Sequence, residues 1–328
     1  MTTDSPLRVS VIVPTYKRPD LLVRCLTALM RQSLSDETYE IIVCDDGPSS
    51  DVEELLRQLT ARQGHVPLLR YVPVTVTQGP AGARNAGWHI AGARIIAFTD
   101  DDTVPDPGWL EAGLNTMASG IDAAVGRIVM PLSMNPTDYE KDAARLQLAE
   151  FATANCFVRR DALEAVGGFD ERYTQAWRED SDLHFSLLKK GCRIVSAPEA
   201  VVIHPLRPAP FAAGLAMQKK VMFDVLLYRK FPRLYRERIR KGPPWFYLCV
   251  TASLLVVVIC FLAGWTAAAE TAIYAWLTLS LGFFFYRLVR SSFALRNIGE
   301  LLVTSALIPP LSIFWRAVGA VRFGRGLP

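Results

Sequence analysis

Residues 94–106 read "RIIAFTDDDTVPD", a strand-like apolar run that ends in three consecutive aspartates. Residues 95–98 have the composition of an interior β-strand. Three carboxylates directly after such a strand repel one another, and burial raises their pKa values unless a positive group lies close by. The stretch therefore requires a cation if it is buried. An Asp-rich turn before a proline is also typical of a solvated turn, so this segment alone leaves both interpretations open.

Strand and helix patterns alternate in the residues before this stretch. The strand patterns are "RVSVIVPTY", "EIIVCDDG", "LLRYVPV" and "RIIAF", and helical patterns follow Pro19, Ser50 and about Gly82. Ser50 with Glu53 forms a plausible capping box for the second helix, which is expected to run to about Ala61. The alternation predicts an α/β fold with a mostly parallel sheet, whose ligand crevice lies beyond the carboxyl ends of the strands. Mixed helix and strand is expected from Asp106 to about Pro205.

Two polar clusters fall at predicted strand ends or helix starts. Asp46, after the second strand, could accept hydrogen bonds from a nucleobase edge or from sugar hydroxyls, or it could belong to a solvated turn. In "TQGPAGARNAG", Arg84 and Asn85 stand at a helix start, where backbone N–H groups and a guanidinium could meet a phosphate. A helix cap made of small residues explains the same pattern. No Walker or dinucleotide-binding fingerprint is present.

The aspartates after the fourth strand are candidates for a metal site. We expect Asp100 and Asp102 to alternate along an extended chain, so that both side chains share one face and hold a hard cation, Mg²⁺ or Mn²⁺, against phosphates. His204, which follows the strand "AVVIH", could be a third ligand or a structural histidine. In "AWREDSDLHFSLLKKG", Glu179 and Asp180 could complement the helix dipole, or Asp180 could point into the crevice as a general base.

Six stretches resemble, in order, motifs of the family 2 glycosyltransferases: "VSVIVPTYKRPDLLVRCLTALMRQ", "EIIVCDDG", "GPAGARNAG", "IIAFTDDD", "GGFDERY" and "WREDSDL". The resemblance covers about residues 7–205. It implies a GT-A (nucleotide-diphospho-sugar transferase, Rossmann-like) fold, a UDP-, GDP- or dTDP-linked sugar donor, a divalent cation and inversion at the anomeric carbon. The processive signature QxxRW is absent, which favours transfer of a single sugar.

The resemblance also implies roles for individual residues. Pro14, Thr15 and Asp46 match residues that line the nucleotide base, Arg84 lies near the diphosphate, Asp100 with Asp102 forms the DxD metal motif, and Asp180 is the catalytic base. The full expected donor-binding set is Pro14, Thr15, Tyr16, Arg18, Asp46, Gly82, Arg84, Asn85, Asp100 and Asp101. Trp177, Arg178 and Glu179 are expected on the acceptor side, and His204 is the additional candidate metal ligand.

The C-terminal part of the chain has the composition of a membrane anchor. Residues 1–205 hold 20 Lys and Arg against 28 Asp and Glu, whereas residues 206–328 hold 16 against 4. Trp245–Trp265 contains no charged residue and is long enough to cross a bilayer, and a second apolar stretch, Thr271–Tyr286, follows at once. Arg287 and Arg290 flank the second stretch. Because basic flanks stay on the cytoplasmic side, the pair predicts a transmembrane hairpin with a cytoplasmic catalytic domain.

Four segments are therefore expected: a glycosyltransferase domain (1–205), a basic juxtamembrane helical segment (206–241), two transmembrane helices (242–290) and an interfacial or re-entrant tail (291–328). Pro309 and Pro310 are expected to break the tail. No signal peptide is expected at the N-terminus, and the six cysteines, without a CxxC pair, suit a reducing cytosol.

The expected location is the inner (plasma) membrane, as a multi-pass protein. Membrane lipids and a lipid-linked or glycan acceptor are the expected partners, and nucleic acid is not. Transfer onto a polyprenyl phosphate and a catalytically idle membrane scaffold remain the alternative functions.

Overall fold

The computed structural model describes residues 7–62, 67–324 and 328, and the chain forms two compact units. The first unit comprises residues 1–131 and 145–205, and the second comprises residues 132–144 and 206–328. The first unit ends at Pro205. Residues 132–144 form an excursion of the chain into the second unit, which the sequence patterns do not predict.

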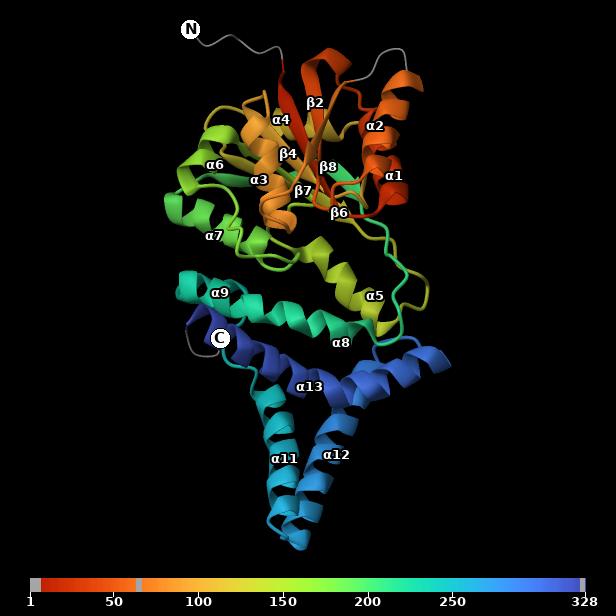
Figure 1. Cartoon of the computed structure of the whole chain (residues 1–328), viewed down its shortest axis with the longest axis vertical. Helices are drawn as coiled ribbons and strands as arrows, with labels where there is room; N and C mark the ends of the chain where they lie inside the picture. The colour runs from red at the N-terminus through yellow and green to blue at the C-terminus, as the bar shows by residue number, and fades with distance from the viewer. Residues whose placement is uncertain (1–6, 63–66, 325–327) are drawn as a thin grey trace. The chain divides into compact units, whose positions relative to one another are not determined.

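An eight-stranded sheet with helices on both faces makes up the first unit (Figure 1). The strands are β1 (Val9–Thr15), β2 (Tyr39–Asp45), β3 (Leu68–Pro73), β4 (Ile95–Thr99), β5 (Val104–Pro105), β6 (Ala123–Val129), β7 (Asn155–Arg159) and β8 (Ile194–Ile203). The helices are α1 (Pro19–Leu29), α2 (Ser50–Arg62), α3 (Pro80–Ile90), α4 (Trp109–Thr116), α6 (Arg160–Val166) and α7 (Glu179–Lys190), and Asp36–Thr38 forms a 3-10 turn.

The strand order, β3-β2-β1-β4-β7-β6-β8-β5, combines a parallel half with a mixed half. β3, β2, β1 and β4 are parallel, as the alternating patterns predict, whereas β7 is antiparallel to both β4 and β6. β8 is parallel to β6 and therefore runs in the same direction as β4. The carboxyl ends of β1, β2, β4 and β8 consequently lie at one edge of the sheet.

Close packing covers both faces of the parallel half. Apolar side chains of α1, α2 and α4 form one core with the odd-numbered residues of β1 and β2, including Val11 and Ile41. On the other face, α3 lies against β1 and β2 at Gly87, where a Cβ would come within 2.6 Å of Cys44 and 2.7 Å of Ile12. Burial on both faces explains why these strands read as continuous apolar runs rather than alternating ones.

The start of α2 differs from the prediction by one residue. The hydroxyl of Ser49, not Ser50, accepts a hydrogen bond from a backbone N–H in the first turn, that of Val52 at 3.4 Å. Ser50 is already part of the helix, so the predicted Ser50–Glu53 capping box is wrong. Ser49 is held in place because its own N–H donates to Asp45 at the end of β2. The cap is therefore set by the strand before it, which local spacing does not reveal.

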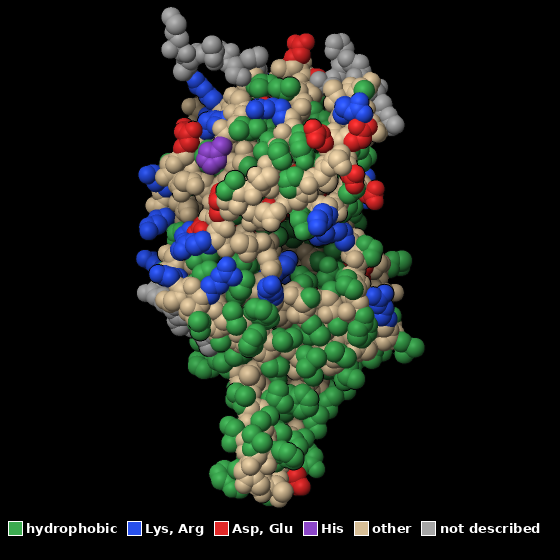
Figure 2. Space-filling view, viewed as in Figure 1, with side chains coloured by type: hydrophobic (Ala, Val, Ile, Leu, Met, Phe, Trp, Pro, Cys, Tyr) green, Lys and Arg blue, Asp and Glu red, His purple; other side chains and the backbone are tan. Residues whose placement is uncertain are grey.

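The second unit is helical, apart from its connecting segments. Its helices are α5 (Asp138–Ala143), α8 (Ala213–Met217), η3 (Gln218–Val221), α9 (Met222–Lys230), α10 (Pro232–Arg238), α11 (Trp245–Leu262), α12 (Thr266–Leu288) and α13 (Leu295–Phe323), and the short helix η2 (Ala144–Leu148) returns the chain to the first unit. α11 and α12 lie side by side as a hairpin, with hydrophobic side chains over its visible surface (Figures 1 and 2). α11, α12 and α13 are each long and apolar enough to cross a membrane.

The predicted break at Pro309 and Pro310 is wrong, because α13 continues through both prolines. A proline inside a helix lacks an N–H and leaves a carbonyl of the preceding turn without its usual bond. Here Pro309 is buried in the packing of the second unit. Contacts with α9, α11 and α12 therefore hold the helix together at a point where its own hydrogen bonds are interrupted.

An ion pair holds the excursion 132–144 on the helices of the second unit. Arg287, at the end of α12, donates to Asp138 at 2.7 and 3.2 Å and to the hydroxyls of Thr304 and Ser305 on α13. The side chain of Arg287 is 13% exposed and that of Asp138 is 29% exposed, so bulk water screens the pair only partly. A second link joins the side chain of Lys141 to the backbone carbonyl of Arg290.

We expect Arg287→Met to release this excursion, because the Asp138 carboxylate would lose its ion pair at a cost of about 1–3 kcal/mol. The measurement is the rate of trypsin cleavage at Lys141 in detergent-solubilised protein, which should rise roughly tenfold or more. Arg296→Met is the matched control, since that side chain is 65% exposed and pairs with Glu300 within one helix. Adding Asp138→Asn to Arg287→Met should recover part of the protection. Equal cleavage of the Arg287 and Arg296 variants would show that the ion pair does not hold the segment.

Candidate active site

The three aspartates after β4 lie in a turn, not on an extended chain as predicted. Thr103 causes the turn, because both its backbone N–H and its hydroxyl donate to the carbonyl of Asp100, at 3.2 and 2.8 Å. The Thr103 hydroxyl also contacts that of Thr99, which in turn donates to the carbonyl of Ala154 on the segment before β7. The chain then pairs with β8 as the short strand β5, with Val104 opposite Ile203.

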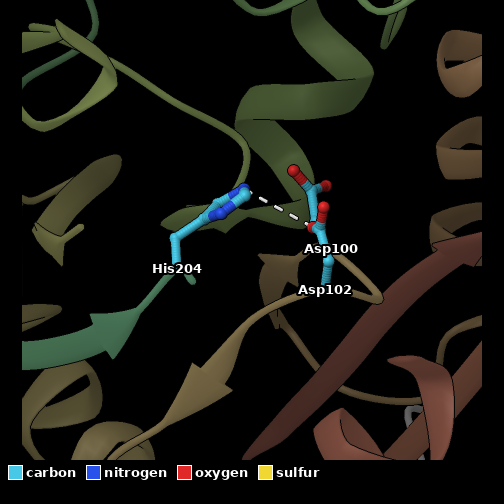
Figure 3. Close-up of side chains that lie close together, drawn as sticks. All are labelled: Asp100, Asp102 and His204. Atoms are coloured by element: carbon cyan, nitrogen blue, oxygen red, sulfur yellow. Dashed lines mark ion pairs between the residues drawn. The ribbon is translucent and has the colours of Figure 1, made fainter. Parts of the chain in front are cut away.

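This pairing brings His204 to the aspartates and forms a candidate metal site. One ligand atom from each of Asp100, Asp102 and His204 lies within 4.8 Å of the others, and the Nε2 atom of His204 is 3.4 Å from Oδ1 of Asp102 (Figure 3). The Nδ1 atom of His204 is buried and has no hydrogen-bond partner within the described part of the chain. Two carboxylates and an imidazole are suitable ligands for a divalent cation. The residues therefore fit a metal, although their turn geometry differs from the one expected.

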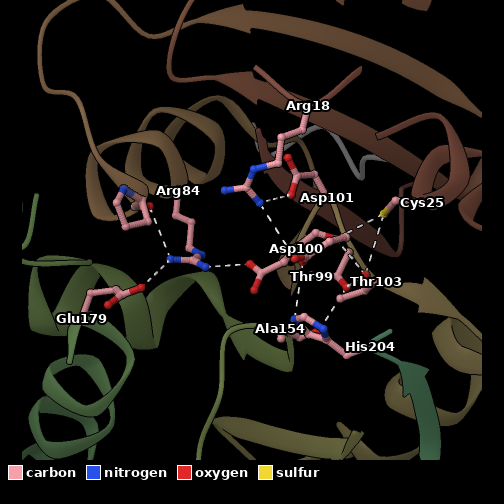
Figure 4. A network of polar contacts seen from close by, with 12 residues as sticks. Arg18, Cys25, Arg84, Thr99, Asp100, Asp101, Thr103, Ala154, Glu179 and His204 are labelled. Carbon is pink, nitrogen blue, oxygen red and sulfur yellow. Dashed lines mark hydrogen bonds and ion pairs between the residues drawn. The ribbon is translucent and has the colours of Figure 1, made fainter. Parts of the chain in front are cut away.

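Asp101 points away from this cluster and is held by the residues after β1. It accepts hydrogen bonds from the Thr15 hydroxyl at 2.8 Å and from Arg18 at 3.1 Å (Figure 4). Arg18 also lies 3.8 Å from Asp102. Burial raises the pKa of Asp101 to about 6, even though Arg18 and Thr15 oppose the shift. Thr15 and Arg18 thus contact the aspartate turn directly, in addition to the donor-binding role that the sequence implies for them.

Arg84 on α3 links the aspartate turn to α7. Its guanidinium donates to Asp100 at 2.7 Å and to Glu179 at 3.2 Å, and its side chain is only 3% exposed (Figure 4). Burial alone would lower the pKa of Arg84, but the two carboxylates raise it, so the group stays charged. The aromatic ring of Phe169 lies 5.8 Å from the guanidinium carbon. One buried cation therefore pairs with carboxylates from two distant parts of the chain.

Glu179 and Asp180 begin α7 next to this cation. Burial and the neighbouring Asp180 raise the pKa of Glu179, while Arg84 opposes the shift. Burial also raises the pKa of Asp180, against the Ser181 N–H, Arg84 and Arg178. Asp180 accepts the Ser181 N–H at 2.7 Å. Glu179 is buried and bound to Arg84, whereas Asp180 is half-buried, so the two carboxylates have different environments.

The residues predicted on the acceptor side lie at the N-terminus of α7. Arg178 has a left-handed backbone, with φ of 74°, and its guanidinium carbon is 4.8 Å from the centre of the Trp177 ring. A positive φ is costly for a residue with a side chain and is frequent at functional sites. The arrangement fixes the direction in which Glu179 and Asp180 leave the turn.

Asp46 and Asn85, both predicted to bind the donor, also hold loops in place. Both carboxylate oxygens of Asp46 accept the N–H of Gly79, at 2.8 and 2.9 Å. Asn85 donates to the carbonyl of Phe169 and to Glu171 and accepts from the N–H groups of Phe169 and Trp88. Close packing explains why position 82 is a glycine, because a Cβ there would come within 2.0 Å of the Thr77 carbonyl. Donor contacts by these three residues stay a prediction.

The structure thus gathers eight of the sixteen predicted site residues into one network. Those joined by direct contacts around the aspartate turn are Thr15, Arg18, Arg84, Asp100, Asp101, Asp102, Glu179 and His204. Pro14 is half-buried between the buried Val13 and Thr15 of β1, and Tyr16 is half exposed beside Gly47. Thr99, Thr103 and Cys25 contact the turn too but have no sequence signal beyond their nearness to the motifs.

Comparison with known proteins agrees with this architecture. The family model for glycosyl transferase family 2 matches residues 10–169, and that for glycosyl transferase family group 2 matches residues 95–289. Glycosyltransferase AglE of Haloferax volcanii is 29% identical over 220 residues, which cover 63% of this chain and 70% of AglE. The chain spans a smaller share of other curated relatives, for example 39% of the chondroitin synthase of Escherichia coli.

Two solved structures show the same fold at low identity. The mannosyltransferase PcManGT from Pyrobaculum calidifontis, in complex with GDP-Man and Mn²⁺, is 20% identical and aligns over 96% of this chain and 86% of its own, with a TM-score of 0.55. S. aureus TarS 1–349 in complex with UDP is 16% identical and aligns over 97% of this chain and 92% of its own, with a TM-score of 0.52. The predicted GT-A fold is confirmed, and the chain belongs to glycosyltransferase family 2.

Proposed function

We propose that the chain is a membrane-anchored inverting glycosyltransferase that moves one sugar from a nucleotide-sugar donor to a hydroxyl of a lipid-linked or membrane-associated acceptor. The observation that carries the proposal is the site at the carboxyl edge of the sheet. There the ligand atoms of Asp100, Asp102 and His204 lie within 4.8 Å of one another, and Arg84 connects Asp100 to the Glu179–Asp180 pair. Arg84 thus links the candidate metal site to Glu179, the residue directly before the candidate base Asp180.

The donor is proposed to be UDP-, GDP- or dTDP-linked. The two structural neighbours are complexes with GDP-Man and Mn²⁺ and with UDP, which supports a nucleotide-sugar donor and a divalent cation here. Asp100, Asp102 and His204 would hold the cation, and the imidazole in this set favours Mn²⁺ over Mg²⁺. When bound, it would neutralise negative charge on the donor diphosphate. Arg18 and Arg84 supply further positive charge from the protein itself.

Asp180 is proposed as the general base. It takes the proton of the acceptor hydroxyl as that oxygen forms a bond to the anomeric carbon, and the bond from that carbon to the donor diphosphate breaks with its electron pair. Direct displacement inverts the anomeric carbon. The raised pKa of Asp180 makes its carboxylate a stronger proton acceptor. Glu179 suits the role less well, because Arg84 binds it.

The membrane part of the proposal rests on α11 and α12. They form an apolar hairpin, and the charged residues closest to its open end are basic. Arg240 and Lys241 precede α11, and Arg287 and Arg290 close α12, so the positive-inside rule favours a cytoplasmic catalytic unit at the plasma membrane. An anchor of this kind suits a lipid-linked acceptor.

The experiments described below also distinguish this proposal from two alternative functions. Transfer to a polyprenyl phosphate would need no base, because a phosphate is already a nucleophile near neutral pH. A catalytically idle scaffold would show no turnover with any donor. Membership of a glycosyltransferase family and the intact set of carboxylates support an enzyme over a scaffold.

Replacing both Asp100 and Asp102 with Asn should abolish metal-dependent donor binding, since two anionic ligands are lost. We expect the affinity for donor in the presence of Mn²⁺ to fall by about 100-fold or more, measured by calorimetry with the donor selected from a panel of nucleotide sugars. Asp106→Asn, directly after β5, is the control and should leave binding unchanged. Unaltered binding by the double variant, with its fold intact by circular dichroism, would exclude this metal site.

Asp180→Asn should lower kcat for a hydroxyl acceptor by roughly 10² to 10⁴ while the donor Kd stays nearly constant. The amide keeps the shape but cannot take a proton. With a phosphate acceptor the decrease should be much smaller, which separates the two transfer reactions. If Glu179→Gln, rather than Asp180→Asn, produced the large decrease, Asp180 would not be the base.

The orientation of the hairpin can be tested by cysteine labelling. A cysteine at Ala268, in the first turn of α12, should react only with reagent added outside, and one at Gly242 only with reagent on the cytoplasmic side. The background needs Ser in place of Cys249 and Cys260, the two cysteines of α11. The reverse labelling pattern would place the catalytic unit on the outer side.

A further inference from the structure

α13 carries polar side chains on its buried face and apolar ones on its exposed face. Its buried residues are Asn297, Leu301, Thr304, Ser305, Ile308, Pro309, Ser312, Arg316, Gly319 and Phe323, and five of these ten have polar side chains. Val303, Leu307, Phe314 and Val321 are exposed by 37, 43, 55 and 89%. A helix at a protein–water boundary has the opposite arrangement. The outward face of α13 therefore suits hydrocarbon rather than water.

Four of the exposed apolar residues of α13, Val303, Leu307, Phe314 and Val321, form one straight stripe, while Leu295 and Leu302 are exposed beside it. At about 100° per residue, positions 303, 307, 314 and 321 point within about 40° of one another around the helix. No charged residue lies on α13 between Glu300 and Arg316. The stripe is thus continuous over about 27 Å, given a rise of about 1.5 Å per residue.

Buried polar groups of α13 are satisfied by the other helices of the second unit. Arg316 donates to Asp224 on α9 at 2.9 Å, with the two side chains 4 and 3% exposed, and also contacts Ser312. On the N-terminal half, Arg287 of α12 donates to Thr304 and Ser305 at 2.9 and 3.1 Å. These contacts fix which face of α13 points inward.

α13 is nevertheless poorly suited to cross the bilayer. Its uncharged stretch, residues 301–315, is about 22 Å long at 1.5 Å per residue, shorter than the roughly 30 Å of hydrocarbon. Its C-terminal half packs along α9, which ends in Arg229 and Lys230. Figure 1 shows α13 lying across the open end of the hairpin rather than alongside it, in agreement with its contacts to both α11 and α12.

We propose that α13 lies in the plane of the membrane, at the boundary of headgroups and acyl chains, with the stripe of Val303, Leu307, Phe314 and Val321 among the lipid acyl chains. Arg296 and Arg322, at its two ends, would then both lie at the level of the lipid phosphates. This inference rests on the membrane anchoring proposed above but not on the sugar-transfer reaction. It makes the bilayer surface, and not only its interior, a binding partner of the chain.

Spin labels at four single cysteines test the orientation directly. The cysteines replace Val303, Leu307, Phe314 and Val321, one at a time, in full-length protein whose Cys192, Cys249 and Cys260 are Ser, reconstituted into vesicles of phosphatidylcholine and phosphatidylglycerol in about equal amounts. Depth is measured from collisions with oxygen and with a water-soluble nickel complex. A label at Leu255, an exposed position in the middle of α11, is the deep reference.

We expect all four labels to report the same shallow depth, about 5–10 Å below the headgroups, and the Leu255 label to lie much deeper. Depths that change steadily along α13, by up to about 27 Å, would show a spanning helix and overturn the proposal. Four labels in water would overturn it as well. A Leu255 label in water would instead contradict the anchoring by the hairpin, so the two failures are distinguishable.

Discussion

Three carboxylates at the carboxyl end of a buried strand need positive charge within a few ångströms, and much of the first unit supplies it. Arg18 after β1 pairs with Asp101 and lies 3.8 Å from Asp102, Arg84 on α3 pairs with Asp100, and the His204 ring after β8 lies beside Asp102. These partners come from three separate parts of the chain. They converge because β1, β4 and β8 run in the same direction, so their carboxyl ends share one edge. The topology of the sheet therefore brings together the groups that compensate the negative charge of the aspartate turn.

Arg84 also explains how two adjacent carboxylates at the start of α7 can differ in chemistry. Its guanidinium binds Glu179 and Asp100 together, which commits Glu179 to a buried ion pair. Burial raises the pKa of both carboxylates, but Asp180 is only half-buried and is therefore the more accessible of the two. Arg178, with its left-handed backbone, stands directly before α7, so Glu179 and Asp180 are its first two residues. Arg84 binds the first of them, which leaves the second as the candidate base of the proposed reaction.

The alternating strand and helix patterns predict the parallel half of the sheet because each element there is a local run with clear ends. They do not predict that Asp100 and Asp102 lie in a turn, since the turn depends on Thr103 and on the pairing of β5 with β8. His204 could be named as a candidate ligand only from its position after a strand. Its approach to Asp102 depends on pairing between residues about a hundred positions apart. The hydrogen bonds of Asn85 with residues 169–171 are likewise non-local, as is the packing that carries α13 through Pro309 and Pro310.

Buried charges also have partners in the second unit, but the outer surface of its long helices is apolar rather than polar. Arg316 with Asp224 and Arg287 with Asp138 place ion pairs inside the helical bundle, while apolar side chains occupy the outer surface of α11, α12 and α13. In water this distribution would cost free energy twice, through exposed apolar area and through desolvated charge. In a bilayer the apolar exterior is favourable, and a polar group turned outward would be the costly arrangement. The buried ion pair of Arg316 with Asp224 therefore holds α13 with its apolar face outward, as the proposed membrane anchoring requires.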